Sequence, residues 1–330
     1  SWLREAPSGP SDPGPAPCDL GAQVVHELAR RGTRPDEPAD AKFDGAYGVV
    51  AGLAALRAIA ASGQRPRRSI EVVAWMNEEG SRFAPGMMGS AVFTAKRRLE
   101  DIAAVRDKGG CSVREELDRV LAQERDLPQR PLGFPVAGHL EAHIEQGPLL
   151  EAEGRTIGVV TGIGGKRTFR VVVQGEPAHA GTSSRAERRD ALVSAVAIVD
   201  ALQRAIWDEA DTVRFTIGMF SVEPNAPSVV PARVTFSIDL RHDSDEVVRT
   251  LGDKVSVVCQ AARGKCDVTV TPLLYDPPLE FPAAIRARVR DAAARLGLSQ
   301  QDLPSPAGHD SRYLHYFCPT GMLFIPCKGG

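Results

Sequence analysis

The chain has 330 residues, a length that suits two domains, or one domain with an insertion, better than one continuous core. Its 43% hydrophobic and 25% charged residues are typical of a globular protein, and a formal net charge of −2 gives no reason to expect nucleic acid or an anionic membrane as a partner. No apolar run approaches the roughly 20 residues that span a bilayer. The cysteines are scattered without C-x-x-C spacing, which argues against a disulfide framework or a cysteine zinc site and favours a reduced, cytoplasmic setting.

The N-terminal part shows little periodicity. Residues 7–19 contain five prolines, so we expect a disordered or aberrant segment over 1–41. Order is expected from about Lys42. Residues 46–62 are apolar almost all round, which predicts a buried helix that ends at Gly63. The chain opens Ser-Trp-Leu and has no signal-like segment, so we interpret it as a fragment.

The first expected strand leads to a pair of carboxylates. The run Ile70–Ala74 is rich in β-branched residues, which predicts a buried strand at 70–76. Glu78 and Glu79 would follow its end, at the sheet edge where open α/β proteins bind ligands. Because adjacent ionised carboxylates repel each other, a metal held by one and a proton accepted by the other would stabilise the pair. A solvated acidic turn is the alternative.

Helix and strand patterns continue downstream. We expect a helix near 88–98, an amphipathic helix near 113–125 and a strand through His139–Glu145. On a strand His139, Glu141 and His143 share one face, so two imidazoles and a carboxylate could project together. A lone strand histidine is usually structural, but the turn Glu-Gln-Gly that follows would leave His143 at a strand end.

From about residue 166 the pattern becomes β-α-β-β-α-β. The expected strands are 167–174, 212–220, 233–240 and 267–274, and the expected helices are 189–206 and 244–262. This order is typical of a ferredoxin-like antiparallel sheet with helices on one face. A helix at 283–296 and a buried strand at 321–326 follow. We therefore predict an α/β catalytic domain of residues 42–165 and 273–330, interrupted by a lid of residues 166–272.

Further polar residues lie in Gly-flanked or Pro-flanked loops. They are Asp44, before the first helix; His179, in Gly-Glu-Pro-Ala-His-Ala-Gly-Thr; Asn225 and Ser228, in Pro-Asn-Ala-Pro-Ser-Val-Val-Pro; Arg241, in Asp-Leu-Arg-His; and His309 with Asp310. Asp44 could cap the helix or bind a metal. Arg241 could bind a substrate carboxylate, or form a salt bridge to Asp239 or Glu223.

Asp, Glu and His ligands without cysteine are typical of hydrolytic metal sites rather than structural zinc sites. At such a site a metal lowers the pKa of bound water toward ~7 and a carboxylate accepts its proton during attack on a carbonyl. The motifs Asn-Glu-Glu-Gly-Ser-Arg-Phe, His-Ile-Glu-Gln-Gly-Pro, Ala-His-Ala-Gly-Thr and Ala-Gly-His-Asp point to this chemistry.

Together these motifs resemble the zinc-dependent amidohydrolases that include N-carbamoyl-L-amino-acid hydrolases, β-ureidopropionases and allantoate amidohydrolases, in the aminoacylase and carboxypeptidase-like metallopeptidase clan. The resemblance covers about Lys42 to Gly330. It implies an α/β, aminopeptidase-like catalytic domain with an inserted ferredoxin-like lid that mediates homodimerisation. It also implies two divalent metal ions per subunit, zinc or else manganese, cobalt or nickel, and a small ureido or amide substrate that carries a carboxylate.

The resemblance also implies roles for single residues. Asp44 is similar to the carboxylate that bridges two metals, Glu79 and His143 to ligands of one metal each, and Glu78 to the general base. The residues similar to substrate-binding positions are Gln146, His179, Asn225, Ser228, Arg241 and His309. Arg241 would hold the substrate carboxylate, and His179 would reach the partner's active site.

The chain departs from the family in two places. The family's His-x-Asp-Thr motif, which precedes the bridging aspartate, has no histidine at the corresponding stretch 32–42. The family's last Ser-His ligand would fall just beyond Gly330. A local frameshift across 8–41 is our hypothesis for the first departure, and resequencing of the gene would test it.

These observations leave three interpretations of function. The first is a dimeric, metal-dependent hydrolase of N-carbamoyl amino acids, which the sequence Arg-Phe-Ala-Pro-Gly-Met-Met-Gly-Ser favours. The second is an allantoate or related ureido amidohydrolase. The third is a catalytically impaired remnant that dimerises through its lid. Sequence alone gives neither the side-chain and enantiomer preference nor the native metal.

Overall fold

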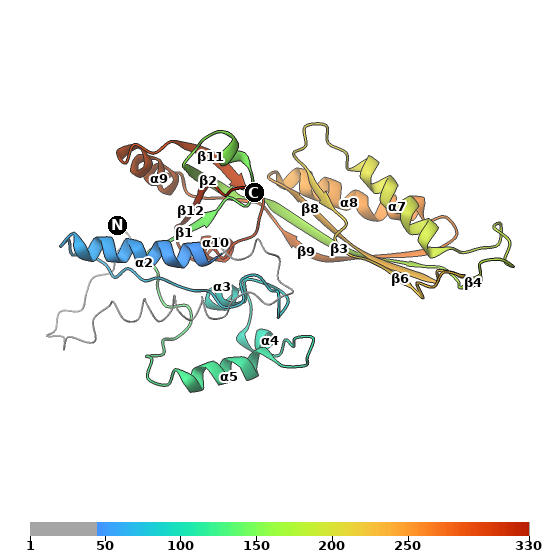
Figure 1. Ribbon diagram of the computed structural model, residues 1–330, viewed down its shortest axis with the longest axis horizontal. Helices are drawn as coiled ribbons and strands as arrows, with labels where there is room; N and C mark the ends of the chain where they lie inside the picture. The colour runs from blue at the N-terminus through green and yellow to red at the C-terminus, as the bar shows by residue number, and fades with distance from the viewer. Residues whose placement is uncertain (1–44, 330) are drawn as a thin grey trace. The chain divides into compact units, whose positions relative to one another are not determined.

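A computed structural model describes residues 45–329, which divide into two compact units (Figure 1). Within these residues, unit 1 comprises 45–161, 281–303 and 308–329, and unit 2 comprises 162–280 and 304–307. Asp44 and the segment 1–41 lie outside the described residues. Among the described helices none is long and apolar enough to cross a membrane.

Unit 2 has the ferredoxin-like order. Its elements are β3 (Gly165–Gln174), β4 (Ala178–His179), α7 (Ala191–Ala205), β5 (Arg214–Thr216), β6 (Phe220–Glu223), β7 (Val229–Val230), β8 (Arg233–His242), α8 (Asp245–Ala262), β9 (Asp267–Asp276) and β10 (Leu279–Glu280). The main sheet has the antiparallel order β5-β8-β3-β9, with β6 also paired to β8. The small strands β4 and β7 pair separately. The expectation of a split β-α-β-β-α-β arrangement is confirmed.

The core of unit 2 lies between its sheet and its two helices. Along β8 the residues Val234, Phe236, Ile238 and Leu240 alternate with half-buried polar residues and face this core. Helices α7 and α8 pack against each other and cover one face of the sheet (Figure 1). Asp190 is the N-cap of helix α7. Its carboxylate accepts hydrogen bonds from the backbone N–H groups of Leu192 and Val193 in the first turn.

Unit 1 combines short helices with a mixed sheet. Its elements are α2 (Ala46–Ala61), α3 (Met88–Phe93), α4 (Leu99–Ala103), α5 (Val113–Gln123), β1 (His139–Ile144), α6 (Leu149–Ala152), β2 (Ile157–Ile163, whose last two residues belong to unit 2), α9 (Ala283–Arg295), β11 (Gln300–Ser305, which also enters unit 2), α10 (Ser311–His315) and β12 (Thr320–Ile325). Strand β1 pairs in parallel with β12, and β12 pairs antiparallel with β2. Strand β11 also pairs with β2.

Helix α2 packs closely against β1. A Cβ at Gly48 would lie 2.7 Å from the carbonyl oxygen of Ala142, so only glycine fits this approach. The helix forms as expected, but none of its residues is buried within the described structure, contrary to the expectation of a buried helix.

The expected strand at 70–76 is wrong. Within residues 45–329 this stretch pairs with no strand, and Ile70 and Val73 are 38% and 42% exposed. A β-branched composition favours extended backbone, but a strand also needs a partner that satisfies its amide and carbonyl groups. Among the described residues, the carboxylate pair therefore follows a segment without a strand partner.

Other boundaries also differ from expectation. The helix expected at 88–98 ends at Phe93, because Ala95 adopts a left-handed conformation with φ of 57°, and α4 then begins at Leu99. The strand expected at 212–220 is two short strands, β5 and β6. Other elements were not expected: strands β2, β4, β7, β10 and β11 and helices α4, α6 and α10. The other predicted helices and strands agree with the structure to within a few residues.

Candidate active site

The end of β1 carries a buried histidine with a defined tautomer. His143 is 7% exposed, and its Nδ1 lies 2.8 Å from the carbonyl oxygen of Ile144. Because a carbonyl oxygen only accepts hydrogen bonds, Nδ1 carries the proton and, in the neutral ring, Nε2 carries the lone pair. This arrangement, in which one ring nitrogen donates to a carbonyl, is the usual state of a metal-ligating histidine.

A carboxylate and a second imidazole lie beside His143. One potential ligand atom each from Glu141, His143 and His309 lies within 4.8 Å of the others. The rings of His143 and His309 have centroids 4.6 Å apart, and Nδ1 of His309 is 3.8 Å from Oε1 of Glu141. Strand alternation places Glu141 and His143 on one face as predicted, whereas His309 comes from the loop before α10.

Glu141 remains ionised although its side chain is only 17% exposed. Its carboxylate accepts the backbone N–H of Ser311 at 3.1 Å and the Ser311 hydroxyl at 2.7 Å. Burial opposes ionisation, but the nearby imidazoles of His139, 3.8 Å away, and His309, together with the Ser311 bond, outweigh it, so the pKa falls to about 2. A buried anion between imidazoles favours a cation at this position.

The pKa of the neighbouring Asp310 is shifted in the opposite direction. The Ser90 hydroxyl on α3 donates a hydrogen bond to its carboxyl group. Burial raises the pKa of Asp310 to about 7, and the negative charge of Glu141 contributes in the same direction. The loop that carries His309 is thus held by hydrogen bonds to β1 on one side, through Ser311, and to α3 on the other.

Glu78 and Glu79 lie in a loop that is closed at its neck. The carbonyl of Glu78 accepts the N–H of Met87 at 2.7 Å, and the Asn77 side chain donates to the carbonyl of Phe83, also at 2.7 Å. A Cβ at Gly86 would lie 2.3 Å from the Glu78 carbonyl oxygen, so glycine is required there. The predicted roles of the two carboxylates stay predictions, since Asp44, their expected companion, precedes the described residues.

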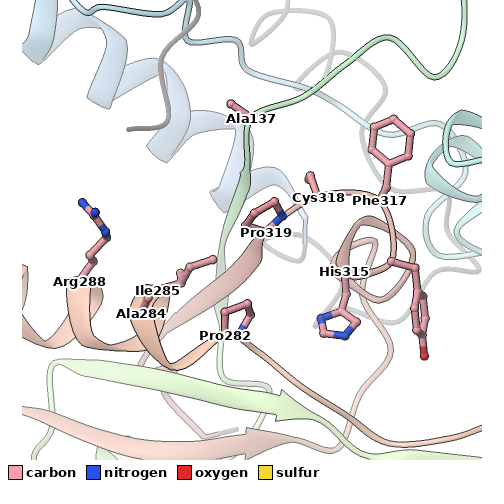
Figure 2. A pocket seen from close by; sticks show the side chains of 10 residues that line it. Ala137, Pro282, Ala284, Ile285, Arg288, His315, Phe317, Cys318 and Pro319 are labelled. Atoms are coloured by element: carbon pink, nitrogen blue, oxygen red, sulfur yellow. The ribbon is translucent and has the colours of Figure 1, made fainter.

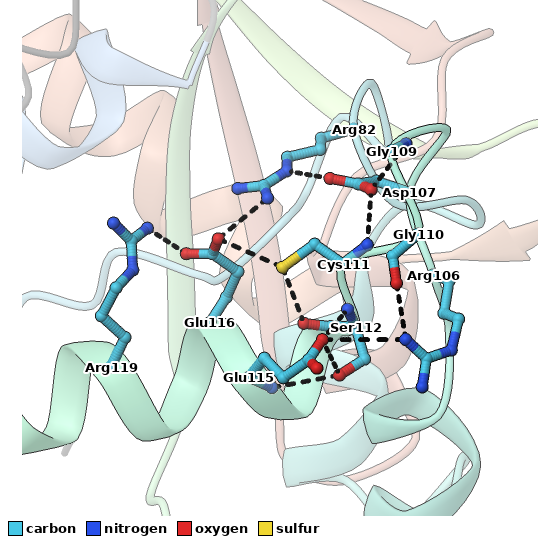
Figure 3. A network of polar contacts seen from close by, with 10 residues as sticks. All are labelled: Arg82, Arg106, Asp107, Gly109, Gly110, Cys111, Ser112, Glu115, Glu116 and Arg119. Carbon is cyan, nitrogen blue, oxygen red and sulfur yellow. Dashed lines mark hydrogen bonds and ion pairs between the residues drawn. The ribbon is translucent and has the colours of Figure 1, made fainter.

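The far side of this loop is anchored by a polar network (Figure 3). The Arg82 guanidinium donates to Asp107 and to Glu116 of α5, each at 2.8 Å. Glu116 also accepts from Arg119, and Cys111 lies 3.5 Å from it. The hydrogen bonds from Arg119 and Arg82 lower the pKa of Glu116 to about 2. The network fixes the loop that presents Glu78 and Glu79.

Two of the predicted lid motifs meet in unit 2. Strand β4, which contains His179, pairs with β7, and Ala180 N–H donates to the carbonyl of Ser228 at 3.1 Å. Asn225, in the same loop as Ser228, has a φ of 55°. The two loops are about forty residues apart in the sequence, with one helix and two short strands between them. They thus form one small substructure.

Arg241 forms the salt bridge that was the alternative to substrate binding. Its Nε and Nη2 donate to Asp239 at 2.8 and 3.0 Å, and Nη1 donates to the carbonyl of Pro306 at 2.9 Å. Lys166 also pairs with Asp239 at 3.0 Å. A guanidinium has five N–H donors, so hydrogens on Nη1 and Nη2 remain for a substrate carboxylate.

The last predicted residue, Gln146, follows β1 as an exposed residue with a φ of 55°. Its neighbour Glu145 caps α6 by accepting two backbone N–H groups, at 2.9 and 2.8 Å. Sequence reasoning missed the supporting residues Ser90, Asn77 and Ser311. Asn77 directly precedes the carboxylate pair, and Ser311 follows Asp310, but neither pattern indicates which distant group each one binds.

One pocket of unit 1 does not coincide with these residues. It measures about 590 Å³ and is lined by Ala137, Pro282, Ala284, Ile285, Arg288, His315, Tyr316, Phe317, Cys318 and Pro319 (Figure 2). Burial, and then the charge of Arg312, lower the pKa of His315, so this imidazole is neutral at pH 7. None of the predicted site residues lines the pocket.

Comparison with known proteins identifies the class of this fold and site. The sequence profile of the peptidase family M20/M25/M40 matches residues 33–330, so the chain belongs to this family of hydrolases. It is 34% identical to the N-carbamoyl-L-amino-acid amidohydrolase of Paenarthrobacter aurescens over 91% of this chain and 77% of that enzyme. It is 32% identical to the allantoate amidohydrolase of Bacillus subtilis over 94% and 76% of the two chains.

Solved structures agree with these relatives. A hydantoinase/carbamoylase family amidase from Burkholderia vietnamiensis matches with a TM-score of 0.75 and 41% identity, covering 87% of this chain and 69% of that one. The structure of AtUAH in complex with glyoxylate matches with a TM-score of 0.75 and 28% identity, covering 87% and 70%. The relatives are amidohydrolases, enzymes that hydrolyse C–N bonds.

Proposed function

We propose that the chain hydrolyses the C–N bond of an N-carbamoyl amino acid, giving the amino acid, ammonia and carbon dioxide. The observation that carries this proposal is the buried cluster of Glu141, His143 and His309 in a chain whose relatives include several N-carbamoyl-L-amino-acid amidohydrolases. A relative solved with glyoxylate, a small carboxylate, supports a substrate that carries a carboxylate group.

The residues present fit divalent metal ions. In the tautomer inferred for His143 the proton is on Nδ1, so Nε2 is the nitrogen that would coordinate a metal, and Glu141 and His309 offer an oxygen and a nitrogen within the same small volume. By resemblance to the family, Asp44 and Glu79 would complete the ligands of two ions, zinc or else manganese, cobalt or nickel. When bound, such ions supply Lewis-acid activation of water and of the substrate carbonyl.

The chain's own residues supply binding and proton transfer. Glu78 accepts the proton of the attacking water, and the closed neck of its loop holds its backbone in place. Arg241, oriented by Asp239, binds the substrate carboxylate with its remaining N–H groups. Gln146 lies against the substrate amide. The other substrate contacts are proposed for His179, Asn225 and Ser228, whereas His309, which the resemblance made a substrate binder, is proposed as a metal ligand beside Glu141.

The assembly and location are part of the same proposal. Unit 2 acts as a lid through which two copies form a homodimer, as in the family that the chain resembles. The described cysteines form no disulfide, which supports a reduced, cytoplasmic setting. Neither nucleic acid nor a membrane is proposed as a partner.

Replacement of the proposed base gives a direct test. Glu78→Gln should lower turnover of N-carbamoyl amino acids by a factor on the order of 10² or more, because it removes the base and no metal ligand. Metal content should stay unchanged. Glu124→Gln, at an exposed carboxylate at the end of α5, is the matched control and should leave turnover unchanged. An equal loss in both variants, or none in Glu78→Gln, contradicts the assignment.

Two other outcomes separate the alternatives. Relatives from Bacillus subtilis and Arabidopsis thaliana named for allantoate make allantoate the second candidate substrate. Ammonia release from allantoate, in preference to N-carbamoyl amino acids, would favour that function. Less than one tightly bound divalent ion per chain at neutral pH, together with no ammonia from either substrate, would favour the impaired remnant.

A further inference from the structure

The loop after β4 fixes the proton of His179 on one ring nitrogen. Nδ1 of His179 accepts the backbone N–H of Gly181 at 3.1 Å and that of Thr182 at 3.2 Å. A nitrogen that accepts hydrogen bonds carries no proton, so the neutral ring has its proton on Nε2. A Cβ at Gly181 would lie 3.3 Å from the ring, and the absence of a side chain lets the backbone approach it.

The turn that provides these two N–H groups is closed on itself. The Ser183 hydroxyl donates to the carbonyl of His179 at 2.7 Å, and Ser183 N–H donates to the same carbonyl at 3.2 Å. These bonds hold the backbone in the conformation that aims both amides at the ring. The turn is exposed and has no packed core beneath it, so its geometry depends on its hydrogen bonds.

One side chain outside the turn completes it. The Arg188 guanidinium donates from Nη2 to the carbonyls of Ala180 and Ser183, at 2.5 and 3.1 Å, and from Nε to the Ser183 hydroxyl at 3.1 Å. Within residues 45–329, Arg188 forms no ion pair. Its charge-assisted bonds are therefore all directed at the turn, where the planar guanidinium bridges both of its ends.

The next residue, Arg189, makes different contacts. Arg189 donates to Glu176 at 2.7 Å, to Asp267 at 2.8 Å and to the carbonyl of Lys265 at 3.0 Å. It thus connects the ends of strands β3 and β9 and, within the described part of the chain, donates no side-chain hydrogen bond to the turn that carries His179. The two adjacent arginines have the same charge but stabilise different parts of unit 2: Arg188 binds the turn, and Arg189 connects strand ends.

We propose that Arg188 is a positioning residue that holds the His179 turn so that Nε2–H faces outward as a hydrogen-bond donor to an oxygen of the substrate. The inference rests on the proposed function only for the identity of the substrate. The fixed tautomer itself follows from the hydrogen bonds of the turn.

The tautomer can be measured without substrate. In protein with nitrogen-labelled histidine, long-range proton–nitrogen spectra distinguish the ring nitrogen that carries the proton, and the His179→Gln spectrum assigns the signal among the seven histidines. Wild type should show the proton on Nε2. Arg188→Gln should give a mixture of tautomers, Arg188→Lys a smaller change, and Arg189→Gln the wild-type spectrum.

Kinetics give the second readout. Loss of a positioned donor in a site of this kind lowers turnover by up to 10²–10³, so Arg188→Gln, which displaces the donor without removing it, should lower kcat by about 10-fold. KM should change by less than about 3-fold, and Arg188→Lys should recover part of kcat. Arg189→Gln should keep wild-type kcat.

The outcomes are distinct. A wild-type His179 spectrum in Arg188→Gln overturns the inference, and so does an equal change in the Arg188→Gln and Arg189→Gln variants, which would indicate general loosening of unit 2. If Arg188→Gln does not fold, the Arg188→Lys spectrum decides between the same results. If the wild type hydrolyses no ureido substrate, the proposed function fails, while the spectra still decide the positioning role.

Discussion

The core of unit 2 allows one stability prediction to be worked through. Leu202 on α7 is fully buried among the residues that join the helix to the sheet. Leu202→Ala removes apolar carbon atoms whose transfer from water contributes about 2.4 kcal/mol, at about 0.8 kcal/mol per carbon. A remaining cavity of about 50 Å³ would add about 1.2 kcal/mol, at about 24 cal/mol per Å³. We therefore expect the free energy of unfolding of unit 2 to fall by about 3.5 kcal/mol.

The assay should report each unit separately, because a chain with two units need not unfold in one step. Hydrogen exchange across a urea series, read by mass spectrometry, follows unit 2 through peptides of β3 and β8, and unit 1 through peptides of β1 and β12. Val196→Ala is the matched control on the same helix, at a side chain that is 56% exposed, and should be close to neutral. A loss below about 1 kcal/mol in Leu202→Ala, or an equal shift in both units, would refute the reasoning about this core.

Three further outcomes follow from the structure. Asp190→Ala removes the acceptor of the Leu192 and Val193 amides, at 3.0 and 3.1 Å, and should lower the stability of unit 2 by about 1 kcal/mol in a urea titration, with Asp190→Asn closer to wild type. Gly175→Ala would place a Cβ 2.0 Å from the carbonyl oxygen of Arg189, so thermal unfolding should occur at a lower temperature than in wild type, and an unchanged melting curve would contradict the close approach. Burial raises the pKa of the Cys259 thiol to about 12, so alkylation at pH 8.5 should leave Cys259 unmodified in the folded chain and label it after denaturation, with half-exposed Cys327 labelled in both.

The ferredoxin-like unit was predictable because its local patterns agree with its contacts. Every second residue of β8 is buried, and the buried residues of α7 recur at helical spacing, so the periods of the sequence match the faces that pack. The break between β5 and β6 was not predictable. It falls near Gly218. The apolar pattern continues through this glycine, so the sequence does not indicate at which residue the strand stops pairing with its neighbour.

Unit 1 was harder to predict because its elements depend on distant partners. The stretch 70–76 has a strand composition but pairs with no strand in the described structure, whereas β11, with a proline and several polar residues, does pair with β2. In both cases the outcome is decided by the neighbouring backbone rather than by local preference. Strand β2 has a strongly apolar sequence and could have been predicted from its composition.

The candidate site was predictable only to the extent that it follows strand alternation. Glu141 and His143 on one face required nothing beyond the period of a strand. The approach of His309 depends on the fold, since this residue follows β11 and precedes α10, and its sequence motif does not state which strand it faces. Arg241 and Asp239, two residues apart on β8, could have been a pair or a substrate site, and the structure shows that the pair forms while donors remain.

The charge balance of the Glu141 cluster links the fold to the chemistry. The groups that lower the pKa of this carboxylate include two imidazoles and a serine. Because an imidazole coordinates a metal only through an unprotonated nitrogen, binding of a divalent ion and release of protons should be coupled at this site. The side chain of Glu141 is only 17% exposed, so solvent screens its negative charge little and a bound cation would stabilise it more than it would an exposed carboxylate.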